Sequence, residues 1–415
     1  MSCCFPERYL FMRLNLKNLK CSLSRILEEN TPHDMLVQLE ELVRCFWNSI
    51  TMSPKPIVLF GAGGKGKAAL SVLHQRGVYP VCFCDNNPAV QNTQFEGLHC
   101  LSYAELREKY KEYIIFISAT VEKAVEIRNQ LKAQGESNCI LHFCVPFKLD
   151  YELYSISNFV TNRTFFSSFL NKITDIQTKK LFILNLYYKC VGDALPLQSY
   201  IDGESFFDSM LIPDHGQHTY LDIGAFSGDT LQMFHRYCNG RYGSILAVEP
   251  DKENFHRLEQ FVRDRGWLNV EMINLGAFNK KGLLRFYSMS GEGAFNANFF
   301  KSPATTMDRH YMVEVQNGQS EARSNEIAVD TVDNILQGRP VTVLKTNAMG
   351  ADAMILEGTH NSIQQWKPAI VLEYGSTPQA LTDIPQFLMR IQPQYRFFLR
   401  QKRIRNDSKT LLYAL

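Results

Sequence analysis

The sequence predicts an α/β protein with two doubly wound, Rossmann-like domains joined by a helical segment. Short apolar runs alternate with amphipathic stretches over residues 53–149 and again over 215–415, which is the pattern of parallel sheets covered by helices. Each region also has a glycine-bearing turn directly after an apolar run and an acid at the end of the next one. A length of 415 residues exceeds what one ordinary core supports. We therefore expect a helical segment over 1–52 and a helical connector over 150–214 beside the two domains.

The composition is that of a soluble globular protein and narrows the partners. Hydrophobic residues make up 45% and charged residues 21%, and the net charge of +2 gives no argument for a nucleic-acid or membrane surface. The basic cluster Arg400, Lys402, Arg403 and Arg405 is most simply interpreted as a solvated face. The eleven cysteines form no metal-type pair of CxxC motifs, and no charged leader precedes an apolar run. We expect a cytoplasmic protein with free thiols, no metal, and a small molecule as its partner.

The N-terminal region reads as helix and then as a small alternating domain. Leu36, Leu39, Leu42, Val43 and Phe46 recur at helical spacing, and Pro54 and Pro56 mark a boundary. From there to residue 149 the apolar runs predict strands at Ile57–Phe60, Val81–Cys84, Tyr113–Ser118 and Ile140–Val145, and helices at 65–76, 102–110 and 121–134. This is a compact half-Rossmann sheet.

The first glycine turn matches G-x-G-x-x-G at Gly61, Gly63 and Gly66, after a strand and before a helix. Asp85 ends the next strand, 19 residues after Gly66, a spacing that suits a ribose on the acid and phosphates on the helix. The stretch VLFGAGGKGKAAL…VCFCDNNP…FEGLHCLS resembles the small N-terminal Rossmann-like domains of sugar-modifying acyltransferases and epimerase-like proteins. That resemblance implies a pocket for a nucleotide or nucleotide-sugar, or a vestigial one.

The second domain begins with a different turn. The strand Tyr220–Ile223 runs into D-x-G-x-x-x-G, with Asp222, Gly224 and Gly228, and the strand Ile245–Val248 ends on Glu249. Glycines allow a close backbone approach, and the second acid accepts both hydroxyls of a ribose. The turn favours S-adenosylmethionine over a dinucleotide. Later strands are predicted at Val270–Asn274, Leu283–Tyr287, Val341–Leu344, Ala369–Glu373, Tyr395–Leu399 and Thr410–Tyr413, with a polar excursion at 288–325 as a lid or acceptor loop.

The C-terminal two hundred residues resemble the FkbM family of S-adenosylmethionine-dependent methyltransferases. The resemblance rests on Asp222-Ile-Gly-Ala-Phe-Ser-Gly-Asp-Thr230, Val248-Glu-Pro-Asp251, Val332-Asp333, Lys345…Gly350-Ala-Asp352…Leu356-Glu-Gly358 and the closing stretch from Ile384 to Ala414. It implies a class I methyltransferase sheet, with Asp222, Gly224 and Gly228 around the methionine portion of the cofactor. It also implies Glu249 on the ribose and residues near Asn274 beside the adenine. The implied reaction is O-methylation of a sugar or another hydroxylated small molecule.

The acceptor side departs from the family at four positions. Asn347 and Met349 stand where the family has acids, and Gly375 and Gln401 stand where a related subgroup tends to have histidines. None of the four titrates near neutrality. Either other groups carry the chemistry, namely Glu373, Asp352, Lys345 or the loop pair His310 and Tyr311, or the domain is a binding module that holds the cofactor without catalysis. A nicotinamide-dependent enzyme working through Gly61–Gly66 and Asp85 is the third possibility. The acceptor and the oligomeric state stay open.

Overall fold

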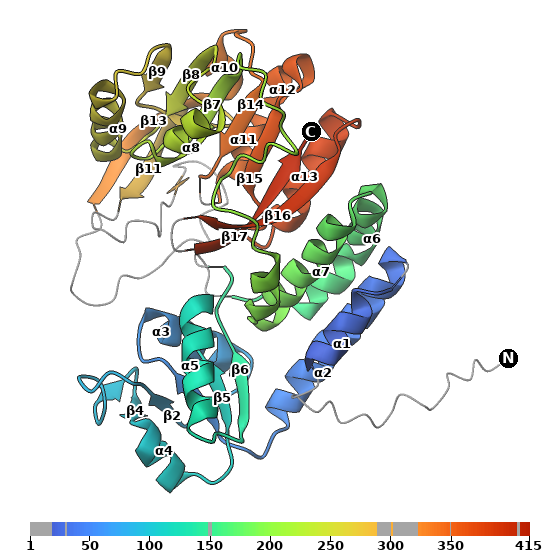
Figure 1. Cartoon of the computed structure of the whole chain (residues 1–415), viewed down its shortest axis with the longest axis vertical. Helices are drawn as coiled ribbons and strands as arrows, with labels where there is room; N and C mark the ends of the chain where they lie inside the picture. The colour runs from blue at the N-terminus through green and yellow to red at the C-terminus, as the bar shows by residue number, and fades with distance from the viewer. Residues whose placement is uncertain are drawn as a thin grey trace, which may run out of the picture. The chain divides into compact units, whose positions relative to one another are not determined.

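The computed structural model describes residues 19–29, 31–147, 152–288, 300–301, 323–348, 350–404 and 407–415. His310, Tyr311, Met349, Arg405 and most of the predicted excursion at 288–325 lie outside these residues. The chain forms two compact units (Figure 1). Unit 1 comprises Met1–Phe147, Tyr151–Asn171 and Phe182–Ser199, and unit 2 comprises Lys148–Asp150, Lys172–Leu181 and Tyr200–Leu415. The predicted connector over 150–214 is therefore shared between the two units.

Unit 1 is built on a six-stranded sheet with the order β3-β4-β2-β1-β5-β6. The strands are β1 (Ile57–Phe60), β2 (Cys82–Cys84), β3 (Gln94–Phe95), β4 (Leu98–Leu101), β5 (Ile114–Ile117) and β6 (Cys139–His142). All neighbours are parallel except the short β3–β4 hairpin. The strand order reverses at β1, because β2 lies on one side of it and β5 on the other. Ligands of open α/β sheets bind at such a point.

Two groups of helices complete unit 1. Helices α3 (Gly64–Gln75), α4 (Tyr103–Lys109) and α5 (Val121–Ala133) connect the strands, as the sequence predicts. Helices α1 (Leu19–Ile26) and α2 (Pro32–Thr51) pack against each other, and the predicted apolar stripe of α2 is buried. Helix α6 (Ile156–Lys172) and most of α7 (Ile176–Val191) follow, with a 3-10 helix at Leu195–Tyr200. The first turn of α2 is capped by Thr31, whose hydroxyl accepts from the Asp34 backbone N–H at 3.1 Å.

Unit 2 contains a seven-stranded sheet with the order β16-β17-β15-β14-β7-β8-β9. Its strands are β7 (Thr219–Ile223), β8 (Ser244–Val248), β9 (Val270–Ile273), β14 (Val343–Thr346), β15 (Ala369–Glu373), β16 (Phe397–Ile404) and β17 (Asp407–Ala414). The first five along the chain are parallel, and β17 inserts antiparallel between β15 and β16. The predicted parallel sheet of a class I methyltransferase is confirmed in this order.

Unit 2 also contains helices that pack on the main sheet and a second, smaller sheet. Helices α8 (Asp229–Tyr237) and α9 (Lys252–Asp264) share one core with Tyr220, Ile245, Val343 and Val371 of the sheet. Helices α10 (Val332–Leu336), α11 (Asp352–Glu357), α12 (His360–Trp366) and α13 (Ala380–Ile391) complete the unit. A four-stranded sheet, ordered β10-β13-β11-β12, consists of β10 (Gly276–Phe278), β11 (Gly282–Ser288), β12 (Phe300–Lys301) and β13 (Arg323–Thr331). The polar pattern did not predict β13, whose start falls within the predicted excursion.

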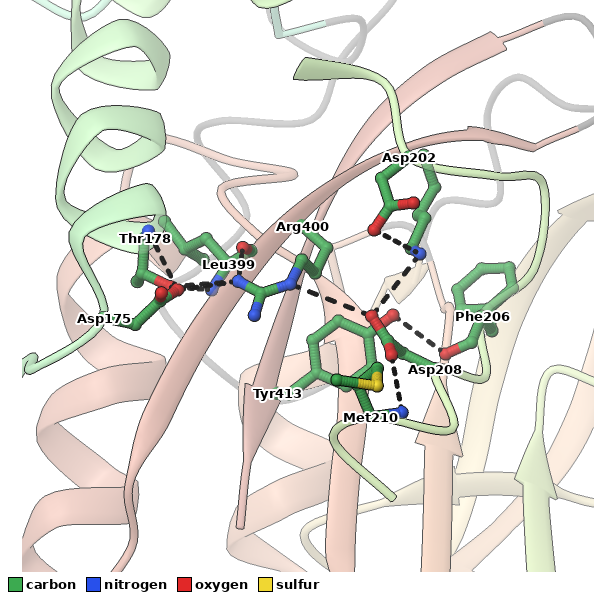
Figure 2. A network of polar contacts seen from close by, with 10 residues as sticks. Asp175, Thr178, Asp202, Phe206, Asp208, Met210, Leu399, Arg400 and Tyr413 are labelled. Atoms are coloured by element: carbon green, nitrogen blue, oxygen red, sulfur yellow. Dashed lines mark hydrogen bonds and ion pairs between the residues drawn. The ribbon is translucent and has the colours of Figure 1, made fainter. Parts of the chain in front are cut away.

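Two members of the predicted basic cluster, Arg400 and Lys402, do not lie on a solvated face. Arg400 Nη1 lies 2.8 Å from Asp175 Oδ2, and Arg400 Nε lies 3.8 Å from Asp208 Oδ2 (Figure 2). Lys402, 5% exposed, approaches Asp208 at 3.6 Å and Asp202 at 3.5 Å. Asp175, Asp202 and Asp208 lie far from β16 in the sequence. Counting the charges near residue 400 therefore does not reveal these pairs. Arg400 and Lys402 thereby join β16 to the segments 172–181 and 200–208 of the same unit.

Two features are absent from the part of the chain that the structure describes. None of the helices in those ranges is both long and apolar enough to cross a bilayer. No group of three or more His, Cys, Asp or Glu side chains within them is arranged to hold a metal ion.

Candidate cofactor site

The turn after β7 strongly favours glycine at its first position. Gly224 has φ +72°, and a Cβ there would lie 2.8 Å from the backbone oxygen of Asn347, directly after β14. Gly228 has φ +92° and immediately precedes α8, where a Cβ would meet the ring of Phe261 at 2.6 Å. Phe226 between them also has a positive φ of 51°, a conformation that costs free energy for a residue with a side chain. The close approach of Asn347 to Gly224 and of Phe261 to Gly228 therefore restricts the backbone conformation of the turn.

Glu249, at the end of β8, faces this turn. Its Oε2 accepts the backbone N–H of Phe226 at 2.8 Å, and its Oε1 accepts that of Asp251 at 3.0 Å. Burial raises the pKa of Glu249 to about 7, against the lowering effect of these two donors. A carboxylate offers about four acceptor positions, so about two stay available for the hydroxyls of a ribose. The predicted pair of glycine turn and acid is thus brought together.

Asp222 lies behind the turn in a buried ion pair. Lys345 Nζ donates to Asp222 Oδ1 at 2.8 Å and to the Gly224 carbonyl at 3.0 Å, and both charged side chains are at most 1% exposed. The Thr230 hydroxyl donates to the other oxygen of Asp222 at 2.5 Å. The ion pair joins β7 to β14, and the bond from Lys345 to the Gly224 carbonyl fixes the start of the turn. Lys345, predicted as a catalytic candidate, therefore has its ammonium directed at the carboxylate and carbonyl oxygens of the turn region.

Asn274, predicted to border the adenine, follows β9. Its side-chain amide donates to the carbonyls of Glu249 at 2.9 Å and Pro250 at 3.1 Å. The side chain therefore fixes the backbone around Glu249. The carboxyl ends of β7, β8 and β9 then present a glycine turn, an acid and an amide at one edge of the sheet, which is where open α/β sheets bind nucleosides.

Comparison with known proteins relates unit 2 to a family of methyltransferases. Residues 222–399 match the family model of the methyltransferase FkbM domain. A crystal structure of a methyltransferase FkbM from Methylobacillus flagellatus shares the fold at a TM-score of 0.65 and 15% identity, covering 97% of this chain and 100% of that one. An Aeropyrum pernix fibrillarin with natively bound S-adenosyl-L-methionine overlaps weakly, at a TM-score of 0.30 and 13% identity, covering 49% of this chain and 70% of that one. No curated protein sequence matches the chain.

At the carboxyl end of β15, Glu373 is the more exposed of the two carboxylates predicted as catalytic. It ends β15, one residue beyond the Thr346↔Leu372 pair that aligns β15 with β14, so it lies level with Asn347 at the same edge as the turn. Its side chain is 29% exposed and pairs with Lys409 of β17 at 2.8 Å. Lys409 is a residue that the sequence reasoning missed, because the antiparallel insertion of β17 beside β15 has no local signal.

Asp352 of the FkbM domain closes the loop after β14. Its Oδ1 accepts from the Thr346 hydroxyl at 2.7 Å and from the Ala348 backbone N–H at 3.0 Å, and the residue is 1% exposed. The same carboxylate accepts the Gly350 N–H at 3.4 Å. Both oxygens are thus engaged in holding the loop, which leaves Glu373 as the candidate that solvent and ligand can reach most easily.

The substituted positions of the FkbM domain differ in their surroundings. Gly375 has φ +69°, a conformation that L side chains rarely adopt, so a histidine there would require a different backbone path. Gln401 is 1% exposed and accepts the Thr410 hydroxyl at 2.6 Å within the β16–β17 pair. Asn347 donates its backbone N–H to the Ile223 carbonyl at 3.2 Å. At least two of the departures are therefore built into the local backbone and core.

The glycine turn of unit 1 has the same hydrogen-bonding plan as the turn of the FkbM domain. The Ala62 N–H donates to Asp85 Oδ2 at 2.7 Å, and the Asn87 N–H donates to Oδ1 at 2.8 Å. Gly61 has φ +122° and packs against the Ser118 carbonyl, and a Cβ on Gly66 would lie 2.0 Å from the Gly61 carbonyl. Gly63 faces open space. The four predicted residues Gly61, Gly63, Gly66 and Asp85 thus form one turn with its acid.

Proposed function

We propose that this chain transfers a methyl group from S-adenosylmethionine to an oxygen of a sugar or another hydroxylated small molecule. The observation that carries the proposal is the buried Glu249 carboxylate held against the glycine turn of a domain that matches the methyltransferase FkbM model. The residues fit the cofactor, because Gly224 and Gly228 add no side chain at the two ends of the turn and Glu249 has acceptor positions left for a ribose.

When bound, the cofactor supplies an electrophilic methyl group on a sulfonium. The chain has to place the acceptor oxygen in line with that methyl and to take up the proton of the hydroxyl. We assign proton uptake to Glu373, because its carboxylate is partly exposed at the same edge as the turn. Lys409 holds that carboxylate in place. We assign Asp222, Lys345 and Asp352 to the support of the two loops, given their burial and hydrogen bonds.

Calorimetric titration with S-adenosylmethionine tests the donor half. We expect saturable binding by the wild type and at least tenfold weaker binding by Glu249→Ala. Glu253→Ala removes an acid from the exposed surface of α9 and serves as the matched control, with unchanged affinity. Absence of saturable binding, or equal binding by Glu249→Ala, contradicts the proposal.

The binding-module alternative is favoured by Asn347 and Met349, which stand where the resembled family has acids. Formation of S-adenosylhomocysteine with a panel of monosaccharides and nucleotide-sugars separates the two functions. If the wild type forms none and the Asn347→Asp, Met349→Glu double variant does, the natural chain is a binding module. If the wild type forms it and Glu373→Gln lowers the rate by about 10²-fold or more, the range of general-base catalysis, the enzyme assignment holds.

We also propose that unit 1 binds a nucleotide or nucleotide-sugar through Gly61, Gly63, Gly66 and Asp85. The support is the hydrogen-bonded pair of turn and acid, placed where the order of the sheet reverses. Titration of the Asp85→Ala variant with UDP and UDP-glucose, compared with wild type, tests this binding.

A further inference from the structure

Lys65, the second residue of α3 in unit 1, lies against a thiol. Its Nζ is 3.6 Å from Sγ of Cys144, two residues after β6, and among the described residues no carboxylate forms an ion pair with it. The nearby Lys67, in contrast, pairs with Glu96 at 2.9 Å. An ammonium in the first turn of a helix adds to the partial positive charge there, so helix stability does not explain its position. The contact with sulfur makes Lys65 and Cys144 a candidate reactive pair.

The backbone around Cys144 is fixed by two neighbouring segments of unit 1. The Cys144 N–H donates to the Gly192 carbonyl at 2.9 Å, and the Phe143 N–H donates to the Ile117 carbonyl at 3.0 Å. A Cβ on Gly192 would lie 2.8 Å from the ring of Phe143, so the two segments pack closely. The thiol is therefore held in place, and the flexible four-carbon side chain of Lys65 is the partner that moves.

The pair lies near the surface of unit 1. Cys144 is 9% exposed, and Lys65 is partly exposed. Gly63 and Gly64, directly before Lys65, are exposed, and nothing lies within 4 Å of a Cβ built on either. A molecule as small as hydrogen peroxide can therefore approach the pair from solvent.

Other buried cysteines of unit 1 have different surroundings. Burial raises the pKa of the Cys82 and Cys100 thiols to about 11 and that of Cys190 to about 12. Because the thiolate is the form that reacts with peroxide, we expect these three to stay reduced near neutral pH. Cys144 differs from them in the ammonium that contacts its sulfur. Thiols beside a lysine ammonium are the ones that oxidants and electrophiles modify selectively.

We propose that Cys144 and Lys65 form a peroxide-sensitive modification site, at which oxidation of the thiol leads to a covalent bond between the sulfur and the lysine nitrogen. The bond joins the start of α3 to the segment after β6 within unit 1. The site is independent of the proposed methyl transfer and nucleotide binding, because neither the cofactor nor a nucleotide takes part in the reaction.

The reaction balances with a single hydrogen peroxide. The Cys144 sulfur attacks one peroxide oxygen and the O–O bond breaks, so sulfur is oxidised to a sulfenic acid by two electrons and the peroxide is reduced to water. The Lys65 amine, after releasing its extra proton to solvent, attacks the sulfur. The S–N bond forms, the S–O bond breaks, and the hydroxyl leaves as a second water with a proton from the nitrogen. The product is a sulfenamide, which two molecules of an external thiol reduce back to the thiol and the amine.

Peptide mass spectrometry of the full-length chain after peroxide treatment tests the proposal. Chymotryptic cleavage after Phe60 and Leu70 releases residues 61–70, which contain Lys65 and no cysteine, so a disulfide cannot imitate the link. We expect this peptide joined to the one containing Cys144, lighter than their sum by two hydrogen atoms and separated again by dithiothreitol. We expect peroxide to modify Cys144 roughly tenfold faster than the exposed Cys21.

The Lys65→Arg variant separates the capture step from the oxidation step. Arginine keeps a cation beside the thiol, but its guanidinium stays protonated and is a poor nucleophile. Cys144 should therefore be oxidised at a rate within about threefold of wild type and remain a sulfenic acid, which dimedone traps. Lys65→Met also removes the cation and should slow the oxidation roughly tenfold. Lys67→Arg, in the same helix, is the matched control and should leave the link unchanged.

Thermal melting gives a second measurement. The link closes a loop between residues that are 79 positions apart, and a covalent link across a long loop restricts the unfolded chain. Oxidation should therefore raise the melting temperature of the wild type, and dithiothreitol should reverse the rise. Oxidation should not raise the midpoint of Lys65→Arg or Cys144→Ser.

Three outcomes overturn the proposal. The first is oxidation of Cys144 no faster than that of Cys21. The second is equal dimedone labelling of Cys144 in the wild type and in Lys65→Arg. The third is absence of the linked peptides once Cys144 of the wild type is fully oxidised. The first and third need no variant, so the test does not depend on the folding of a substituted chain.

Discussion

Glu249 couples cofactor binding to a proton. Burial raises the pKa of its carboxyl to about 7, and the ionised form accepts ribose hydroxyls more strongly than the protonated form does. Below that pH the carboxyl must release a proton before it can accept both hydroxyls. We therefore expect the affinity for S-adenosylmethionine to rise from pH 6 to about pH 8 and then to level off, as measured by calorimetry in buffers of different ionisation enthalpy. The Glu249→Gln variant should bind more weakly and without this rise, and a flat wild-type profile would contradict the ribose assignment.

Lys345 and Asp222 form a buried ion pair, so each is expected to affect the stability of the fold through the charge of the other. Replacing one partner of a buried pair leaves the other charge buried without a counter-charge, which costs about 3–5 kcal/mol. Lys345→Met should lower the free energy of unfolding by roughly this amount, measured by urea denaturation. Arg257→Met breaks the exposed pair with Glu253 and should cost at most about 1 kcal/mol. Similar effects of the two variants would mean that the buried pair does not support the fold.

At the scale of the element, the turn after β7 is set by its contact with the loop after β14. Gly224→Ala has to relieve both a positive φ and a contact of 2.8 Å with the Asn347 carbonyl. We expect it to destabilise the protein by roughly 1–3 kcal/mol and to weaken cofactor binding. Gly282→Ala, with open space around it, should do neither. Unchanged midpoints in both variants on thermal melting would contradict the packing argument.

The sequence predicted those elements whose signal is local. Continuous apolar runs located β1 and β15 to the residue, and the two glycine turns were assigned with their acids. Strand β4, with His99 in only four residues, has too short and mixed a pattern, and β13 alternates polar residues that resemble a loop. The Asp222–Lys345 pair was hidden because its partners are 123 residues apart. The neighbouring placement of β7 and β14 in a doubly wound sheet is the signal that could have found it.

At the scale of the whole molecule, Arg400 and Asp175 join the last strands of unit 2 to the segment 172–181 (Figure 2). Burial alone would raise the pKa of Asp175, but hydrogen bonds from Thr178 and Arg400, with the charge of Arg400, leave the pKa below its ordinary value. The folded state therefore holds this carboxylate ionised more strongly than the unfolded chain does. Its contribution to stability is present above the pKa of an unfolded aspartate, about 3.9, and is lost as the pH falls through the folded value.

Asp175→Asn should therefore reduce the acid sensitivity of the fold. We expect the wild type to lose stability between about pH 5 and pH 3 more steeply than the variant, while the variant is less stable at pH 7. Circular dichroism melts across this range provide the measurement. Parallel curves for the two proteins would place the acid-labile contact elsewhere.

The repeated plan of turn and acid has a practical consequence for affinity purification. In both units a turn N–H donates to a carboxylate 23 residues later in the chain, Ala62 to Asp85 and Phe226 to Glu249. A resin that displays adenosine diphosphate through its base offers a ribose to either carboxylate. Retention on such a resin would then persist in each single acid variant and disappear only when both acids are replaced, so column capture alone is a poor assay for either unit.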